Sequence, residues 1–544
     1  MNNIKAKAPT IRRLAVAALC ALVSLPVLAT AARAAFFATP TQVLMTGEIE
    51  RLSLNTPADV WSAGTMVIGG QNLIIPRNLL ADFPANRLTL QQTFVQAPAA
   101  CVARHESGLA KTDLCNSEGK GALATIAANR SANGNVIVGD LFFEKAIEVV
   151  TGVVTFMDLN QGYYRVNGIQ GSSTTGVMVR MNDPVGRHSV QSGLGCVAGS
   201  LNCSADPRFT LDPDNYTNTA TTGFPVCIPS TVPRPFVDTH GVVGAPGATV
   251  TAKAAADGSG DVLCPTTNRP NPAVTTVVGD SRRFAPIELG DHVTVTGNFE
   301  TVGTTRFLSV WNTVLSAGLL TSSAPGQPDY MLPLANEIDA PAFNINRIRA
   351  VFEGFTTDVA APDVLIWTTH HDPTTNAVHE FPLASVNGCI AVGRGACQPR
   401  PHQYHIDYHS DFPKVTAAQF NDCAQLRAEP RFSPLPCPLG GTMAEQFAVM
   451  SPIPHETQYR TGAKLADLSR PGGPTLFSID VLGNDAKNGQ YVFPMGIGLG
   501  GIAMPVPLGG ALVDQMHVPY SFDGIPWNID RRLSPGGCIG PCEA

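Results

Sequence analysis

The strongest constraint on the fold is a set of short segments in which β-branched or aromatic residues alternate with polar ones. In residues 292–299 (HVTVTGNF) the two valines take one set of alternate positions and the two threonines take the other. Successive side chains of a strand point to opposite faces, so this pattern predicts a half-buried strand. Residues 306–313 (RFLSVWNT) repeat the alternation and are expected to form the next strand.

Three further strands are expected upstream, because residues 147–156, 162–166 and 176–181 are rich in β-branched and aromatic side chains and are separated by turn residues. About a hundred residues dense in Pro, Thr, Asn and Cys then precede residue 292. Three strands, a long excursion and two more strands match the chain order of a five-stranded barrel of OB type, with an insertion between its third and fourth strands. An immunoglobulin-like sandwich is the main alternative.

A glycine just inside a strand recurs along the chain, at Gly47, Gly152, Gly297 and Gly354. Such a glycine often marks the bend or bulge of a barrel strand, so degenerate repeats of one β module are an option. Helices are expected to be few. Residues 416–429 form the clearest helix, and a short one is expected over 77–82. The predicted fold is therefore mainly β, with several small OB-like barrel or sandwich modules and few helices.

Thirteen cysteines are present, and all but Cys20 fall into six pairs of near neighbours. In an exported chain an even number of cysteines favours disulfides, and pairing neighbours would close six small loops. Most of these loops lie in the irregular segments, so the bridges are expected to hold long loops in shape. The expected bridges are Cys101–Cys115, Cys196–Cys203, Cys227–Cys264, Cys389–Cys397, Cys423–Cys437 and Cys538–Cys542.

Export is predicted by the first 34 residues. Four basic side chains precede an apolar run over residues 14–28, and Ala32-Arg33-Ala34 provides the small residues that a signal peptidase recognises. Cleavage is expected after Ala34, which would place the mature protein in the periplasm or outside the cell.

The charge of the chain is acidic, with a formal net value of −7. Residues 1–34 hold five of the 36 basic side chains and no acidic ones, so 31 basic and 43 acidic side chains would remain after cleavage, a net charge of −12. An acidic surface argues against nucleic acid as a partner. No later stretch offers the ~20 apolar residues of a membrane span, because the most apolar one, 496–510, is rich in glycine and contains two prolines.

The length allows three or four modules after the signal peptide at ~100–200 residues each. They are expected in this order: signal peptide 1–34; N-terminal β module 35–145; OB-like module 146–320 with an insertion over 182–285; linker 321–345; β module 346–475 with a histidine-rich segment and the helix 416–429; and a C-terminal β or immunoglobulin-like segment 476–544.

Two resemblances add context. The strings Cys203-Ser204-Ala205-Asp206-Pro207-Arg208-Phe209 and Gly223-Phe224-Pro225-Val226-Cys227-Ile228-Pro229, followed by Cys264-Pro265 and by Asn268-Arg269-Pro270, resemble a block in uncharacterised secreted proteins of bacteria and filamentous fungi. This resemblance covers about residues 140–360, is densest over 196–300, and implies a recurring exported β module without implying an activity. Residues 478–485 (SIDVLGND) are similar to the opening strand of immunoglobulin-like repeats in bacterial surface proteins.

The search for catalytic motifs finds no G-x-S-x-G elbow, H-E-x-x-H pair, phosphate-binding loop or haem motif. One histidine-rich segment, residues 402–411 (HQYHIDYHSD), stands out. In a strand, His405, Asp407, His409 and Asp411 would share one face, where two imidazoles and a carboxylate could bind a divalent metal. His402, or residues 370–372, could add a ligand. A solvated strand edge is the simpler interpretation, so no cofactor is assigned beyond this metal option.

Two functions follow from these features. The first is a non-catalytic exported protein that binds a surface polymer or a protein partner, or has a structural role at the cell surface or in the extracellular space. The second is a metal-dependent extracellular enzyme, a hydrolase or an oxidase, centred on the segment 402–411. The acidic charge and the missing catalytic motifs favour the first.

Overall fold

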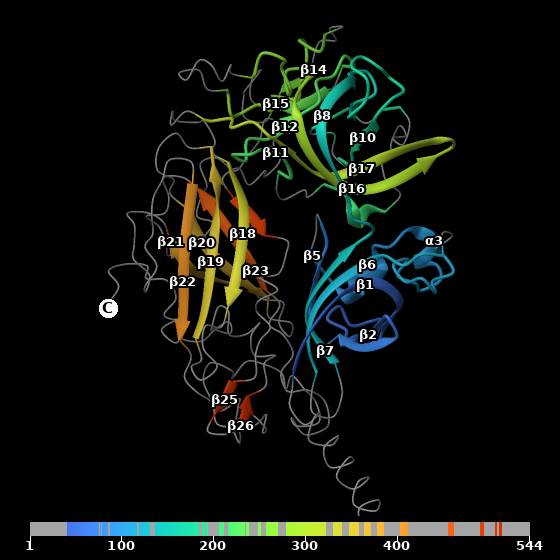
Figure 1. Ribbon diagram of the computed structural model, residues 1–544, viewed down its shortest axis with the longest axis vertical. Helices are drawn as coiled ribbons and strands as arrows, with labels where there is room; N and C mark the ends of the chain where they lie inside the picture. The colour runs from blue at the N-terminus through green and yellow to red at the C-terminus, as the bar shows by residue number, and fades with distance from the viewer. Residues whose placement is uncertain are drawn as a thin grey trace, which may run out of the picture.

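The computed structural model is mainly β, as the sequence predicts (Figure 1). Its described helices are short: α2 (Leu90–Val95), α3 (Ala99–Val102) and the 3-10 turn η1 (Pro207–Phe209). The residues that the structure describes are 41–75, 77, 79–84, 87–116, 119–130, 136–183, 186, 188–190, 192–193, 206–211, 216–233, 235–238, 248–251, 257–269, 279–321, 330–339, 347–357, 364–371, 378–385, 403–411, 455–461, 490–493, 506–508 and 511–513.

The first sheet contains seven strands in the order β3-β2-β1-β6-β7-β4-β5. β1 pairs with β2 and β6, β2 pairs with β3, β6 pairs with β7, and β3 meets β7 in parallel at Ile74 and Ile137. The pairings of these five strands connect in a cycle, which we call the first ring, and the strands pack on a buried apolar core that includes Phe83 and Phe143. The strands are β1 (Thr41–Leu54), β2 (Gly64–Ile68), β3 (Gln71–Ile75), β4 (Leu80–Asp82), β5 (Arg87–Thr89), β6 (Leu123–Arg130) and β7 (Val136–Glu144).

The second sheet contains six strands in the order β10-β9-β8-β16-β17-β11. β10 also pairs in parallel with β17, so the pairings of β8, β9, β10, β17 and β16 form a second ring. Its core contains Val154, Tyr164, Val293 and Leu308, all fully buried. The strands are β8 (Glu148–Asp158), β9 (Tyr163–Val166), β10 (Val177–Met181), β11 (Asn218–Ala220), β16 (His292–Val302) and β17 (Thr305–Leu315).

The two rings use the same strand pairing in the same chain order. The opening strand of each ring changes partner partway along: β1 pairs with β6 up to Glu48 and then with β2, and β8 pairs with β16 up to Val153 and then with β9. A glycine lies near each change. A Cβ on Gly152 would lie 1.8 Å from Oδ1 of Asn167, so a larger residue would displace this side chain from its hydrogen bonds to the backbones of Thr151 and Val153. Two of the four glycines that the sequence marks, Gly47 and Gly152, therefore sit where a strand changes its partner.

One of the two helical predictions is wrong, because strand pairing decides the structure of its residues. Residues 77–82, expected to be helical, contain β4, which pairs with β5 instead. The helix α2 begins nearby at a capping box, in which Thr89 accepts a hydrogen bond from the backbone of Gln92 and the Gln92 side chain accepts one from the backbone of Thr89. The expected helix 416–429 lies outside the described residues.

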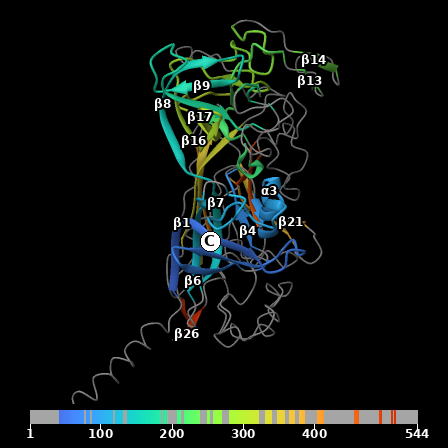
Figure 2. The ribbon, with the colours of Figure 1, turned by 90° about the vertical axis from the view of Figure 1, so that its right-hand side faces the viewer.

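The remaining strands form smaller sheets. A three-stranded sheet has the order β18-β19-β22, and a four-stranded sheet has the order β21-β20-β23-β24. In Figures 1 and 2 these strands lie beside the first ring, and the second ring lies above it. The strands are β18 (Met331–Asp339), β19 (Arg347–Thr356), β20 (Val364–His371), β21 (Val378–Ser385), β22 (Gln403–Asp411), β23 (His455–Thr461) and β24 (Gln490–Phe493). The interval 321–345, expected to be a linker, thus contains β18.

The described residues of the insertion over 182–285 include the disulfide Cys227–Cys264 and several short strands. The insertion contributes β11, which joins the second ring by pairing with β17, and the small strands β12 (Val226–Cys227), β13 (Pro235–Asp238) and β14 (Ala248–Thr251). β12 pairs with β15 (Ala285–Pro286). Near the C-terminus, β25 (Val506–Leu508) pairs with β26 (Ala511–Val513).

Two of the six expected disulfides are confirmed, Cys101–Cys115 and Cys227–Cys264. Both close loops outside the ring strands, as expected. The other eight paired cysteines, Cys196, Cys203, Cys389, Cys397, Cys423, Cys437, Cys538 and Cys542, lie outside the described residues, as does the signal segment. Within the part of the chain that is described, no helix is long and apolar enough to cross a membrane.

Candidate binding surface

An uncharged face covers three adjacent strands of the second ring. Alternate residues of β8, β16 and the end of β17 form three cross-strand rows on it. We call this surface the threonine–valine face. Its rows are Val149, Thr296 and Asn312; Thr151, Thr294 and Val314; and Val153, His292 and Ser316.

The alternation of the sequence explains why the side chains of this face point away from the core. Val293, Val295 and Leu315 take the intervening positions and are buried in the core of the ring. Their neighbours must then point outward, because successive side chains of a strand leave opposite faces. Val149 is 55% exposed and Val153 is 38% exposed. Single exposed valines are common, but these two lie on the same strand and face, with Thr151 between them.

Hydroxyl groups hold the middle of the face together. The Oγ1 atoms of Thr151 and Thr294 lie 3.0 Å apart, and Nδ1 of His292 lies 2.9 Å from Oγ of Ser316. The first ring has an equivalent pair, with 3.1 Å between the Oγ1 atoms of Thr46 and Thr125. Cross-strand threonine pairs stabilise a sheet and leave hydroxyl groups available to a ligand. The face thus offers hydroxyl and methyl groups in a regular array.

The opposite side of the second ring is covered. On β9 and β10, Tyr163, Met178 and Arg180 are all less than a tenth exposed. Arg180 donates hydrogen bonds to the carbonyl groups of Gln161 and Ser192, and none of the described residues accepts a hydrogen bond from its Nε or Nη1 atom. Burial lowers the pKa of Arg180 to about 10. This cation fixes two loops over the sheet and is not accessible to a ligand.

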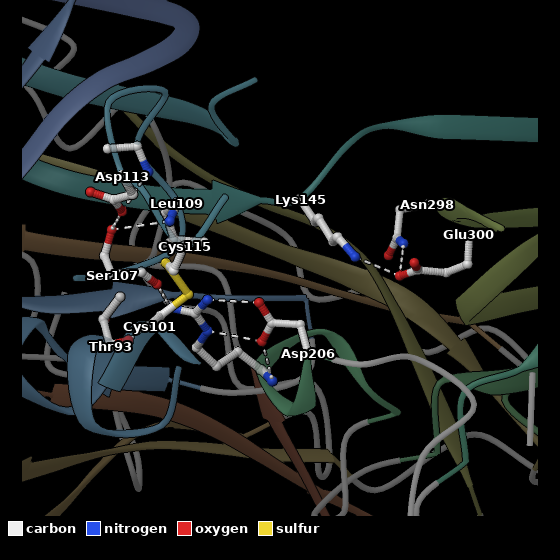
Figure 3. Close-up of polar contacts among 12 residues, drawn as sticks. Thr93, Cys101, Ser107, Leu109, Asp113, Cys115, Lys145, Asp206, Asn298 and Glu300 are labelled. Atoms are coloured by element: carbon white, nitrogen blue, oxygen red, sulfur yellow. Dashed lines mark hydrogen bonds and ion pairs between the residues drawn. A yellow bond between two sulfur atoms is a disulfide. The ribbon is translucent and has the colours of Figure 1, made fainter. Parts of the chain in front are cut away.

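The junction between the two rings contains a second buried arginine. Residues 206–211, which we call the bridging segment, leave the insertion and enter the first ring. Arg208 is fully buried; Nε and Nη2 bind the carboxylate of Asp206 at 2.9 and 2.6 Å. Its Nη1 donates to the carbonyl groups of Thr93 and Ser107 at 2.7 and 2.8 Å. Figure 3 shows Asp206 facing the loop that holds Ser107 and the Cys101–Cys115 bridge.

The next residues of the bridging segment enter both cores. The ring of Phe209 lies 5.5 Å from that of Phe83 in the first ring. Leu211 belongs to the core of the second ring, and its N–H donates to the carbonyl of Asn182. Burying a phenylalanine or leucine side chain contributes roughly 1.5–3 kcal/mol. The bridging segment therefore couples the two rings through apolar contacts as well as charge.

A second link lies where β7 passes into β8. Lys145 pairs with Glu300 of β16 at 2.5 Å, and the Asn298 side chain donates to the same carboxylate at 2.7 Å (Figure 3). The preceding residue, Glu144, is only 7% exposed. Burial raises the pKa of Glu144 to about 7. This carboxyl group therefore changes its charge near neutral pH at the junction.

The predicted metal ligands lie on a confirmed strand. His405, Asp407, His409 and Asp411 occupy alternate positions of β22, which is extended as expected and pairs with β19. Their side chains and His402 lie outside what the structure describes, so the metal site stays a prediction. Among the side chains that the structure describes, which do not include those of residues 365–371, 378–385, 405–411 and 455–461, no group of three His, Cys, Asp or Glu is arranged to hold a metal ion.

Sequence reasoning missed both buried arginines and the threonine–valine face. The alternation over 292–299 did indicate an outward set of threonines, but their continuation across β8 and β17 depends on the strand order. Compared with protein-family models, with curated proteins and with solved structures, the chain has no match in any of the three.

Proposed function

We propose that the chain is an exported, non-catalytic binding protein built from OB-like modules, and that the threonine–valine face binds an uncharged polysaccharide. The observation that carries this proposal is the face itself: three cross-strand rows of exposed and half-buried side chains without a permanent charge. The two disulfides support a place outside the cytoplasm, where such bonds persist.

The chemistry of the face suits a neutral polymer. Sugar rings carry hydroxyl groups on their edges and C–H groups on their faces. Threonine, serine and asparagine side chains can bind the hydroxyl groups, and the valine methyl groups can pack against the C–H groups. The formal net charge of −7 disfavours polyanions such as nucleic acids. An uncharged ligand meets no such repulsion.

The ring pairings support OB-like barrels over an immunoglobulin-like sandwich. In both rings the first strand pairs with the second and fourth, and the third pairs in parallel with the fifth. OB folds often bind ligands on their second and third strands. In the second ring these strands are β9 and β10, whose outer side is covered around Arg180. The free face on β8, β16 and β17 is therefore the better candidate.

Binding to insoluble and soluble neutral polysaccharides tests the proposal. We expect the mature protein to bind at least one of a panel of neutral glucans and chitin, and Val149→Lys/Thr294→Lys to weaken binding at least tenfold. Thr46→Lys, at the equivalent hydroxyl pair of the first ring, is the matched control and should bind like wild type. Far-UV circular dichroism checks that the variants fold. Binding to none of these polymers, or equal binding by both variants, contradicts the proposal; a protein ligand blocked by the same variant would replace the polymer with a protein partner.

The second candidate function is a metal-dependent extracellular enzyme that uses His405, Asp407 and His409. The extended conformation of β22 favours it, because a strand places these three residues at alternate positions. Elemental analysis of the purified mature protein and of His405→Ala/His409→Ala tests it. Stoichiometric metal that disappears in the double variant supports the enzyme, and metal-free wild type contradicts it.

A further inference from the structure

Three histidines occupy one row across three adjacent strands of the four-stranded sheet. His370 of β20 is paired with His379 of β21 on one side and with His455 of β23 on the other. The three come from separate segments, and histidine fills only 12 of the 544 positions. A histidine flanked by histidine on both neighbouring strands is therefore an unusual arrangement.

The register places all three residues on one face of the sheet. Directly opposite residues of antiparallel strands share a face. A residue of a central strand forms a hydrogen-bonded pair with one neighbour and a non-hydrogen-bonded pair with the other, with Cα separations of about 5.5 and 4.5 Å. The Cα atoms of His379 and His455 are thus about 10 Å apart, with His370 between them. This spacing allows three imidazoles to share one ion.

The row lies at one end of the sheet. His370 is the next-to-last residue of β20, His379 is the second residue of β21, and His455 opens β23. Sites in β proteins are often built at strand ends, where loops leave space for a ligand. An ion in this row would therefore be reachable from the end of the sheet.

The residues of the neighbouring rows favour metal binding over ion pairing as the role of the three histidines. Glu380 and Glu456 both lie opposite Thr369, one position along, and so belong to the other face. The next row on the histidine face holds Thr368, Phe381 and Thr457. No carboxylate of these rows shares the histidine face, so ion pairing within these rows does not account for three histidines at paired positions.

We propose that His370, His379 and His455 form a three-histidine site for a divalent transition metal of the zinc class. Neutral imidazole is a preferred ligand of Zn²⁺, with Zn–N distances of about 2.0–2.1 Å. Three protein ligands leave the fourth position of a tetrahedral ion open for water or another ligand. The site is distinct from the predicted ligands of β22, which belongs to a different sheet, and it does not depend on the polysaccharide proposal.

Zinc titration of the metal-stripped mature protein tests the site. We expect one equivalent of Zn²⁺ by calorimetry, and a Co²⁺-loaded protein with the visible spectrum of a tetrahedral nitrogen-ligated ion. His370→Gln, His379→Gln and His455→Gln should each weaken Zn²⁺ binding at least tenfold. Glutamine keeps a polar side chain of similar length, and far-UV circular dichroism checks the fold of each variant.

Two controls separate this site from other histidines. His292→Gln removes an exposed imidazole of the second ring and should leave zinc binding unchanged. His405→Ala/His409→Ala removes the β22 histidines and should also leave it unchanged. Absence of stoichiometric zinc in wild type overturns the proposal, and so do row variants that bind like wild type. Loss of the ion only in the β22 variant would assign it to that strand instead.

Discussion

Replacement of Arg208 by alanine tests whether the bridging segment couples the two rings. The guanidinium group is fully buried, and Asp206 beside it is only 6% exposed. Four of its hydrogen bonds end on the Asp206 carboxylate and on the carbonyl groups of Thr93 and Ser107, 115 and 101 residues away in the sequence. Alanine would leave the carboxylate and both carbonyl groups without these donors.

The expected loss is about 3–5 kcal/mol, which is typical when one partner of a buried ion pair is removed. The two carbonyl groups lie within the same cluster, so their penalties of roughly 1–3 kcal/mol each are not simply additive. Removing the carboxylate as well, in Asp206→Ala/Arg208→Ala, should recover part of the loss because no buried charge then remains unpaired. A typical domain has only about 5–15 kcal/mol of stability, so the single change is a large fraction.

Urea unfolding followed by tryptophan fluorescence and by far-UV circular dichroism measures the effect. In wild type we expect the two rings to unfold together, and in Arg208→Ala we expect an earlier, separate transition. Arg282→Ala is the matched control, because its ion pair with Asp280 is 44% and 27% exposed and should contribute at most about 1 kcal/mol. A loss in Arg208→Ala no larger than in this control would refute the coupling.

Three other changes probe the same scaffold. Burial raises the pKa of Glu144 to about 7 against an ordinary value of 4.5, so the protonated group stabilises the fold below pH 4.5 and this contribution is lost as the pH rises through 7. Urea unfolding at pH 5 and pH 8 should show wild type losing at most about 2.5 kcal/mol of stability relative to Glu144→Gln. Cys227→Ser/Cys264→Ser opens a loop of 37 residues and should cost about 4 kcal/mol, against about 3 for the 14-residue bridge, measured by thermal unfolding. Gly297→Ala places a Cβ 2.1 Å from a backbone carbonyl of β17 and should destabilise by at least about 1–3 kcal/mol, while Gly318→Ala, whose Cβ would have its nearest neighbour at 3.9 Å, should be neutral in the same assay.

The strands could be predicted because alternation is a local signal. Residues 292–299 and 306–313 became β16 and β17, and the structure extends both strands by a few residues as a paired hairpin. The three strands upstream also lie where the sequence places them. A local signal for α2 is present as well, in the capping pair Thr89 and Gln92, although no helix was expected there.

Arg208 and the histidine row were harder to predict, because both depend on contacts between residues that are far apart in the sequence. Arg208 stands in a polar stretch between Pro207 and Phe209 that is typical of an exposed turn, and its partners are a hundred residues away. The histidine row depends on β23 pairing with β20 across more than eighty residues of sequence. Periodicity cannot report either contact, since it describes only the two faces of one segment.

The equivalent hydroxyl pairs of the two rings argue for one module used twice. Thr46 lies just before Gly47 and meets Thr125 on the fourth strand of its ring; Thr151 lies just before a glycine of β8 and meets Thr294 in the same relation. Two sheets with the same strand order need not share a glycine bend, a change of strand partner and a cross-strand threonine pair at equivalent positions. The two rings share all three. The rings differ in the segment after the third strand, which holds helices and one disulfide in the first ring and a long insertion in the second. That insertion supplies Arg208, so the added segment of one copy is what fastens it to the other.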